Sequence, residues 1–134
     1  MADGRRVLAP SYDHASSLGR ELSDEERRDR LTTRDKRRNL EGYTGRARSG
    51  LYLDHLSAKA CHPTDAFLKA AELRPTAAAV WLARLREVRD DAWREVIDRV
   101  PDTAITPTAR QLATKLILST TSALLANTTN DHDT

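Results

Sequence analysis

The side chains best suited to chemistry gather near the N-terminus, in a loop at residues 11–19. The loop offers a carboxylate, an imidazole and hydroxyls, from Asp13, His14, Ser16 and Ser17. A carboxylate can hold a hard cation, a histidine can contact a phosphate, and hydroxyls can line a substrate cleft. Each residue also fits a plainer role, since a turn aspartate bonds its own backbone, a loop histidine faces solvent and serines cap turns.

Other polar groups offer less chemistry. Cys61 is the only cysteine, so the chain has no internal disulfide and no cysteine-based zinc site. His62 lacks a second pair of ligands at metal-binding spacing, and the proline after it favours the start of a helix. The acidic and histidine residues at 131–133 lie in a polar tail, residues 127–134, which we expect to be disordered.

The composition predicts that helices position these side chains. Ala contributes 19 residues and Leu 17, against 5 Val and 3 Ile, which excludes an all-β fold. A length of 134 residues suits one ordinary domain and excludes a two-lobed enzyme. All five glycines precede residue 51, so we expect a loop-rich first part and a continuously helical second part. No apolar run suits a signal peptide or a membrane span, so we expect a cytoplasmic protein without a membrane partner.

Prolines and capping residues divide the chain into expected helices. These cover residues 24–32, 63–73, 75–88, a shorter stretch that stops at Pro101, and 107–126. Ser23 and Glu26 have the spacing of a capping box, and the charged helix behind them should be only slightly buried. The spacing of Trp81 and Val88 predicts a buried stripe, and Trp93 is also expected in the core.

One segment carries a more specific pattern. Residues 6–19 read Arg-Val-Leu-Ala-Pro-Ser-Tyr-Asp-His-Ala-Ser-Ser-Leu-Gly. This run resembles the segment after the catalytic loop of HipA-like kinases, where an arginine, a hydrophobic pair, a proline, an aromatic residue and an aspartate occur. Residues 21–27, 47–52 and 104–110 resemble the helical C-terminal domain of that family. The resemblance covers residues 5–126 and implies a mostly helical C-lobe portion of a protein-kinase-like fold.

The resemblance also implies a function. It places the chain in a phosphotransferase lineage that uses ATP and magnesium, and by position Asp13 would be the magnesium ligand. It implies a strand and metal-binding-type loop over residues 1–20, a charged helix and loop over 21–50, and a helical bundle over 51–126. An antitoxin-like protein or the missing N-terminal part of the kinase would be the partner.

The remaining parts of a kinase site are missing from the sequence. A kinase also needs a catalytic aspartate, an asparagine at the fifth position after it, a phosphate-binding lysine and a glycine-rich cover. Asp35 and Asn39 come nearest to the first pair but are four residues apart, and residues 42–45 lack the spacing of a phosphate loop. We therefore expect a C-terminal kinase fragment that is not catalytic alone, with Val7 and Leu8 on an unpaired strand edge.

A second interpretation assigns the function to charge. Residues 27–38 hold seven basic side chains against Asp29 and Asp35, a net charge of +5. Such a segment could make the chain a nonenzymatic binding module for nucleic acid or for an acidic protein. The alternative is a solvated charged face, because no aromatic residue interrupts the charges and the whole chain carries only +2.

Overall fold

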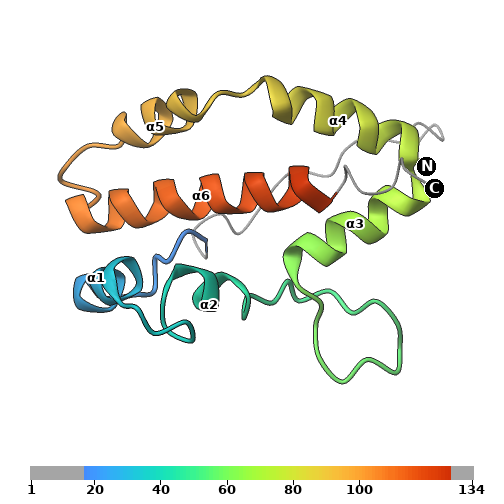
Figure 1. Ribbon diagram of the computed structural model, residues 1–134, viewed down its shortest axis with the longest axis horizontal. Helices are drawn as coiled ribbons and strands as arrows, with labels where there is room; N and C mark the ends of the chain where they lie inside the picture. Colours follow the sequence, from blue (N-terminus) through green and yellow to red (C-terminus); the bar gives the residue numbers. More distant parts are fainter. Residues whose placement is uncertain (1–16, 128–134) are drawn as a thin grey trace, which may run out of the picture.

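The computed structural model describes residues 17–127, and over this range the chain forms helices and loops without a strand (Figure 1). The helices are α1 (Asp24–Thr32), α2 (Leu40–Thr44), α3 (Pro63–Leu73), α4 (Pro75–Glu87), α5 (Asp90–Asp98) and α6 (Pro107–Asn127). The predicted mostly helical class is confirmed for these residues. The extended segment expected around Val7 and Leu8, and nearly all of the polar tail, lie outside the described residues.

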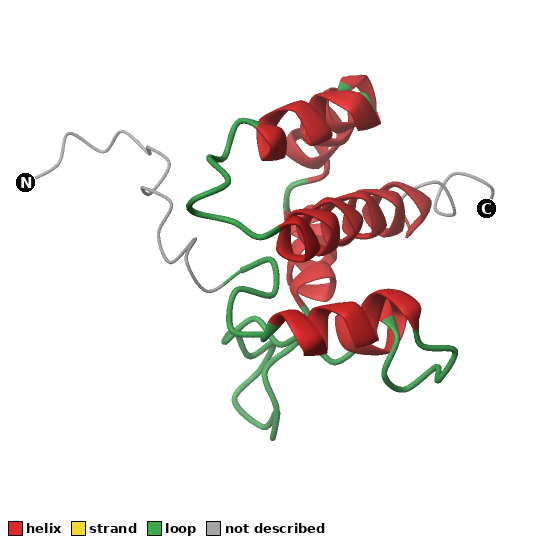
Figure 2. Ribbon diagram, turned by 90° about the vertical axis from the view of Figure 1, so that its left-hand side faces the viewer, coloured by secondary structure: helices red, strands yellow, loops and turns green. Residues whose placement is uncertain are grey.

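The helices form layers around α6. In Figure 1, α4 and α5 run along one side of α6, while α1 and α2 lie on the other, and Figure 2 shows α6 between these layers. α6 contacts α1, α3, α4 and α5, and α1 also contacts α2. The longest helix is therefore the element on which the others assemble.

Side-chain caps fix where the helices begin. At α1, the Glu26 amide donates to Ser23 Oγ over 3.3 Å and the Ser23 amide donates to Glu26 Oε2 over 2.7 Å, which confirms the capping box. At α3, the Thr64 amide donates to His62 Nδ1 over 3.1 Å. Pro63 occupies the first turn of this helix, where no backbone donor is needed. The helix starts predicted from capping residues and prolines are therefore confirmed here.

The short helix α2 was not predicted. Asn39 caps it by accepting from the Gly42 amide over 2.9 Å. The helix spans only five residues, which is too short for a repeating pattern of apolar residues to predict it. A Cβ on Gly42 would collide with the carbonyl of Lys36 and lie 2.7 Å from the Arg37 carbonyl oxygen, so a glycine lets the preceding loop fold back closely on α2.

The most buried side chains centre on α6. Leu112 has no exposed surface, and Ala113 and Leu116 are also buried. Leu82 of α4 and Ile97 of α5 complete the set of buried hydrophobic residues in the described chain. A core of this size stabilises the helices mainly where they meet α6.

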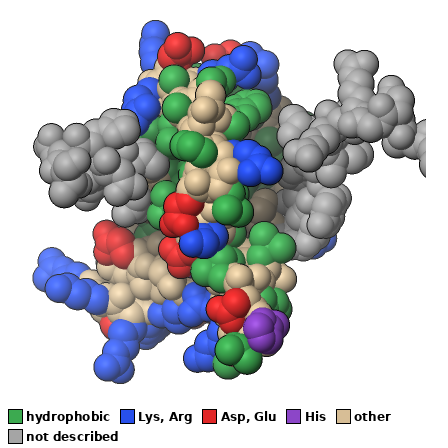
Figure 3. Space-filling view, turned by 90° about the vertical axis from the view of Figure 1, so that its right-hand side faces the viewer, with side chains coloured by type: hydrophobic (Ala, Val, Ile, Leu, Met, Phe, Trp, Pro, Cys, Tyr) green, Lys and Arg blue, Asp and Glu red, His purple; other side chains and the backbone are tan. Residues whose placement is uncertain are grey.

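The predicted buried stripe of α4 is wrong. Trp81 is 52% exposed and Val88 36% exposed, whereas Leu82 is only 6% exposed. Residues 77–83 are apolar without interruption, so their sequence periodicity could not show which face packs. Among the described helices, α4 packs closely only against α3 and α6. Hydrophobic side chains, drawn in green, remain visible in Figure 3 on the face that forms the right-hand side of Figure 1, where α3 meets α4.

Candidate functional site

The predicted magnesium ligand lies outside the described residues, as do its neighbours His14 and Ser16. The role of Asp13 therefore stays a prediction. Among residues 17–127, no three histidine, cysteine, aspartate or glutamate side chains are grouped to hold a metal ion. Ser17 begins the described chain, and its carbonyl accepts from the Arg20 amide over 3.3 Å in a turn.

His62 acts as a structural residue, in agreement with the prediction. Its Nδ1 accepts from the Thr64 amide, so the proton resides on Nε2, which donates to the Thr44 carbonyl over 2.9 Å. The Cys61 sulfur lies 3.3 Å from Ser49 Oγ. Both ring nitrogens of His62 are engaged, so the histidine links α3 to α2 rather than coordinating a metal.

The Asp35 and Asn39 pair serves a turn and a helix cap. Asp35 Oδ1 accepts from the Arg37 amide over 2.9 Å, and the Asp35 carbonyl accepts from the amides of Arg38 and Asn39. These bonds form the local turn that aspartate favours. The turn and the cap of α2 together hold the backbone of the basic loop between α1 and α2 in place.

Three of the seven basic residues at 27–38 are used inside the fold. Arg27 donates to Asp24 Oδ1 over 2.7 Å and to the Gly19 and Arg20 carbonyls over 3.0–3.3 Å, which ties the first turn of the described chain to α1. Arg30 and Arg38 share the carboxylate of Asp29, at 3.2 and 3.0 Å. These three side chains therefore already have partners within the described chain.

The Arg30 guanidinium also lies over the Tyr43 ring, 5.8 Å from its centroid. The Tyr43 hydroxyl donates to Glu21 Oε1 over 2.6 Å. Burial, reinforced by this bond to a carboxylate, raises the pKa of Tyr43 to about 12. The phenol therefore stays protonated, and its ring is covered by a cation.

The other four basic residues of the segment, Arg28, Arg34, Lys36 and Arg37, form what we call the basic surface. All four are exposed, and none makes an ion pair with a residue between 17 and 127. Lys and Arg side chains gather at the lower edge of the molecule in Figure 3, the side that carries α1 and α2 in Figure 1. Asp35 is the only acidic residue within this loop, so a clear positive excess remains.

A cavity of about 800 Å³ lies between α6 and the segments around α1 and α2. Its lining combines an apolar part with three arginines, one from α1 and two from the chain after α2. The residues used below are Arg30, Arg46, Arg48, Trp93, Leu116 and Ile117. They come from segments far apart in the sequence, so no local pattern could have predicted the cavity.

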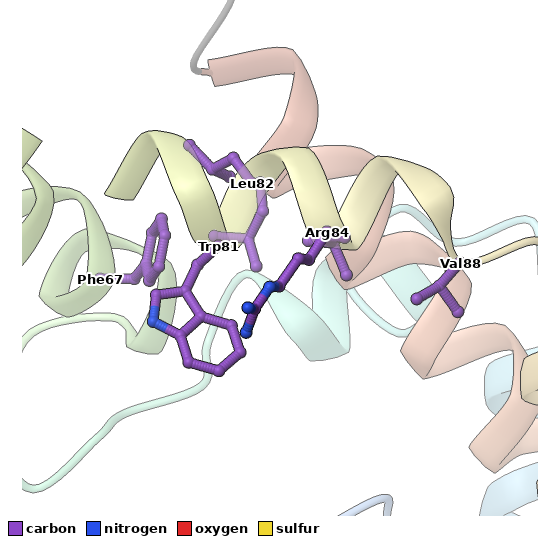
Figure 4. A pocket seen from close by; sticks show the side chains of 7 residues that line it. Phe67, Trp81, Leu82, Arg84 and Val88 are labelled. Atoms are coloured by element: carbon purple, nitrogen blue, oxygen red, sulfur yellow. The ribbon is translucent and has the colours of Figure 1, made fainter. Parts of the chain in front are cut away.

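A second, smaller hollow of about 330 Å³ opens on α4. Figure 4 shows Phe67, Trp81, Leu82, Arg84 and Val88 around it. The Arg84 guanidinium lies 5.1 Å from the centroid of the Trp81 ring. Its lining is almost wholly apolar, so the hollow can receive an apolar group but offers no catalytic side chain.

Comparisons with known proteins provide no family for the chain. No family model matches the sequence, and neither a curated protein nor a solved structure matches it. The likeness to HipA-like kinases therefore depends on the sequence segments quoted above. No helix within residues 17–127 has both the length and the apolar character that a membrane span requires.

Proposed function

We propose that the chain is a nonenzymatic helical binding module whose basic surface binds an acidic segment of another protein. The observation that supports it is the group of Arg28, Arg34, Lys36 and Arg37, exposed and forming no ion pair within the described chain. Opposite charges across an interface steer association and set specificity. The Asp35 turn and the α2 cap hold the loop that presents three of these cations.

Two features favour a protein partner over nucleic acid. Single-stranded nucleic acids are held largely by aromatic faces on which bases stack. Of the first two aromatic residues that follow the basic segment, Tyr43 is covered by Arg30 and Tyr52 is exposed among leucines. In contrast, the loop after α2 exposes Leu51, Tyr52, Leu53 and Leu56, by 50–82%. This loop lies on the same lower side of Figure 1 as α1 and α2. Charged and apolar groups on one side suit a protein interface.

The experiment compares anionic partners directly. Binding of the chain to polyglutamate, mixed-sequence duplex DNA and single-stranded RNA is measured by fluorescence anisotropy at low salt and again at ~0.5 M salt. We expect polyglutamate to bind best and to dissociate at high salt. Stronger binding to either nucleic acid would replace the protein partner, and no binding at low salt would refute the module.

A charge-matched pair of variants identifies the surface. Exposed ion pairs contribute ~0.2–1 kcal/mol each, so Arg34→Gln with Arg37→Gln should weaken binding by about two- to thirtyfold. The control, Arg86→Gln with Arg94→Gln, removes the same charge from exposed positions on α4 and α5. Equal losses in both variants would show that net charge, rather than this surface, controls binding.

The kinase lineage is a second proposal, supported by the run at residues 6–19. In this proposal Asp13 holds magnesium on ATP in a complete kinase, and the present chain lacks the other groups that phosphate transfer needs. We expect the purified chain, incubated with labelled ATP and magnesium, to incorporate no phosphate. Autophosphorylation that disappears in Asp13→Ala would instead establish a complete kinase site in this chain.

A further inference from the structure

The large cavity beside α6 has the features of a small-molecule site. Its volume of about 800 Å³ falls within the range of roughly 300–1,000 Å³ typical of ligand pockets. Segments from both sides of α6 line it, so it belongs to the tertiary structure and not to a surface loop alone. It lies apart from the exposed cations of the basic surface, none of which lines it.

The charge of the lining is one-sided. Arg30, Arg46 and Arg48 all line the cavity, and no aspartate or glutamate does. Arg46 and Arg48 form no ion pair with a described residue, since their bonds go to the carbonyls of Arg37 and Ala47. Two guanidinium groups without carboxylates can therefore receive an anion, and guanidinium binds carboxylate and phosphate oxygens through paired hydrogen bonds.

Two residues of the lining also carry buried hydrogen-bond donors that lack partners among residues 17–127. In the described chain, Arg30 Nε and Trp93 Nε1 are buried and have no hydrogen-bond partner. Both residues line this cavity. Buried polar groups normally have partners, and leaving one unsatisfied is costly. Because both atoms are covered in this structure, a ligand would meet these donors only after a small side-chain movement, and the exposed guanidinium groups of Arg46 and Arg48 remain the primary anion contacts.

A second part of the lining is apolar. Leu85 of α4, Trp93 of α5 and a row of α6 side chains, Leu116, Ile117 and Leu124, form this part. Such a wall cannot stabilise a compact hydrated anion, but it can bury an alkyl or aryl body by the hydrophobic effect. The two parts together call for a ligand with an anionic end and an apolar end.

We propose that this cavity binds a small amphiphilic anion, with a carboxylate or phosphate group near Arg46 and Arg48 and an alkyl or aryl body against Trp93 and α6. This ligand role is separate from the binding of a protein by the basic surface. Both candidate ligands have one anionic head group on an apolar body. Comparing decanoate with decyl phosphate shows whether the site prefers a carboxylate or a phosphate.

The test uses the full chain and the fluorescence of Trp93. The chain has two tryptophans, so a Trp81→Phe background leaves Trp93 as the single reporter. We expect decanoate or decyl phosphate, added below its micelle concentration, to change the emission saturably, whereas decanol and decyltrimethylammonium bind at least tenfold more weakly. Equal binding of decanol would overturn the anionic part of the proposal, and no saturable change with either anion would overturn the site.

Two substitutions locate the head group. Arg48→Gln should weaken anion binding by about tenfold, and Arg48→Glu should weaken it further, because a carboxylate then repels the ligand. Arg48 bonds only its neighbouring carbonyl in the described chain, so these variants should fold normally, which circular dichroism checks. Arg34→Gln, on the basic surface, is the control and should bind like the parent. Unchanged anion affinity in both Arg48 variants would overturn the assignment.

Discussion

The two ends of α6 lie in different surroundings. In Figure 1 its first half lies beside α1 and α5, and this half contains Leu112, Ala113 and Leu116, all buried. Its second half meets α3 and α4, which we call the outer pair, and these two helices leave Leu73, Val80 and Trp81 48–65% exposed. One helix thus supports both a compact core and a partly uncovered apolar layer.

Polar contacts reinforce the difference. At the start of α6, Thr106 Oγ1 donates to Asp24 Oδ1 over 2.8 Å and accepts from the Ala109 amide over 3.1 Å. Arg110 donates to the Ile97 carbonyl over 2.5 Å and to the Val100 carbonyl over 2.8 Å, which closes the end of α5. These bonds connect three helices at one end. This end of α6, which we call the core end, therefore sets the stability of the fold, whereas the outer pair is available for contacts.

The largest expected effect is at the core end. Leu112→Ala removes a wholly buried side chain and should lower the free energy of unfolding by about 2–5 kcal/mol. Leu73→Ala, a matched change on the outer pair at a side chain 65% exposed, should cost under about 1 kcal/mol. Urea denaturation followed by circular dichroism measures both. Equal losses would contradict the division into a core end and an outer pair.

The turn before α1 provides a second comparison. Gly19 has a φ of +70°, and a Cβ there would lie 2.8 Å from Leu112 Cδ2. Gly50 has a similar φ of +74° but nothing within 4 Å of an added Cβ. Gly50→Ala should cost about 1 kcal/mol for the backbone alone, and Gly19→Ala should cost more because it also disturbs the core.

The measurement for the glycine pair is again the midpoint of urea unfolding. The difference between the two variants isolates the contact with Leu112, because both share the left-handed backbone. A cost for Gly19→Ala no greater than that for Gly50→Ala would show that the turn does not pack on α6 in solution.

These elements also show which features of the structure can be predicted from local sequence signals. Local signals were sufficient for the helix starts at Ser23 and His62, because a cap depends on residues only two or three positions away. They failed on α4, where an unbroken apolar run conceals the packing face, and on the five-residue α2. The cavity beside α6 was missed because its lining depends on how distant segments meet. Asp13 lies outside the described residues, so its predicted role depends on the resemblance.

Acid should affect the core end selectively. Hydrogen bonds from Thr106 and Arg27 lower the pKa of Asp24, and bonds from the Ser23 amide and hydroxyl lower the pKa of Glu26. A carboxyl whose pKa is lower in the folded state stabilises the fold when charged. This contribution is complete above the ordinary pKa of the carboxyl and is lost as the pH falls through the lowered pKa of the folded state.

Thermal melting between pH 7 and pH 3 tests this for Asp24→Asn. The melting temperature of the variant should lie below that of the parent at pH 7. The difference should narrow as the pH falls through the lowered pKa of Asp24, because the parent then loses the charge as well. Asp65→Asn on α3 is the control, since Asp65 is exposed and forms no ion pair with a described residue. A difference in melting temperature that stays constant with pH would show that the charge of Asp24 does not stabilise the fold.

The smallest effect is expected on the outer pair. Trp81 is 52% exposed and is held mainly by contacts around the α4 hollow, including the Arg84 guanidinium. Trp81→Gln should therefore change the free energy of unfolding by less than about 1 kcal/mol, as exposed positions usually do. The same substitution at the partly buried Trp93, beside the large cavity, should cost several times more. If Trp81→Gln proved as costly as Trp93→Gln, α4 would be packed in solution as tightly as the core end, and the contrast along α6 would disappear.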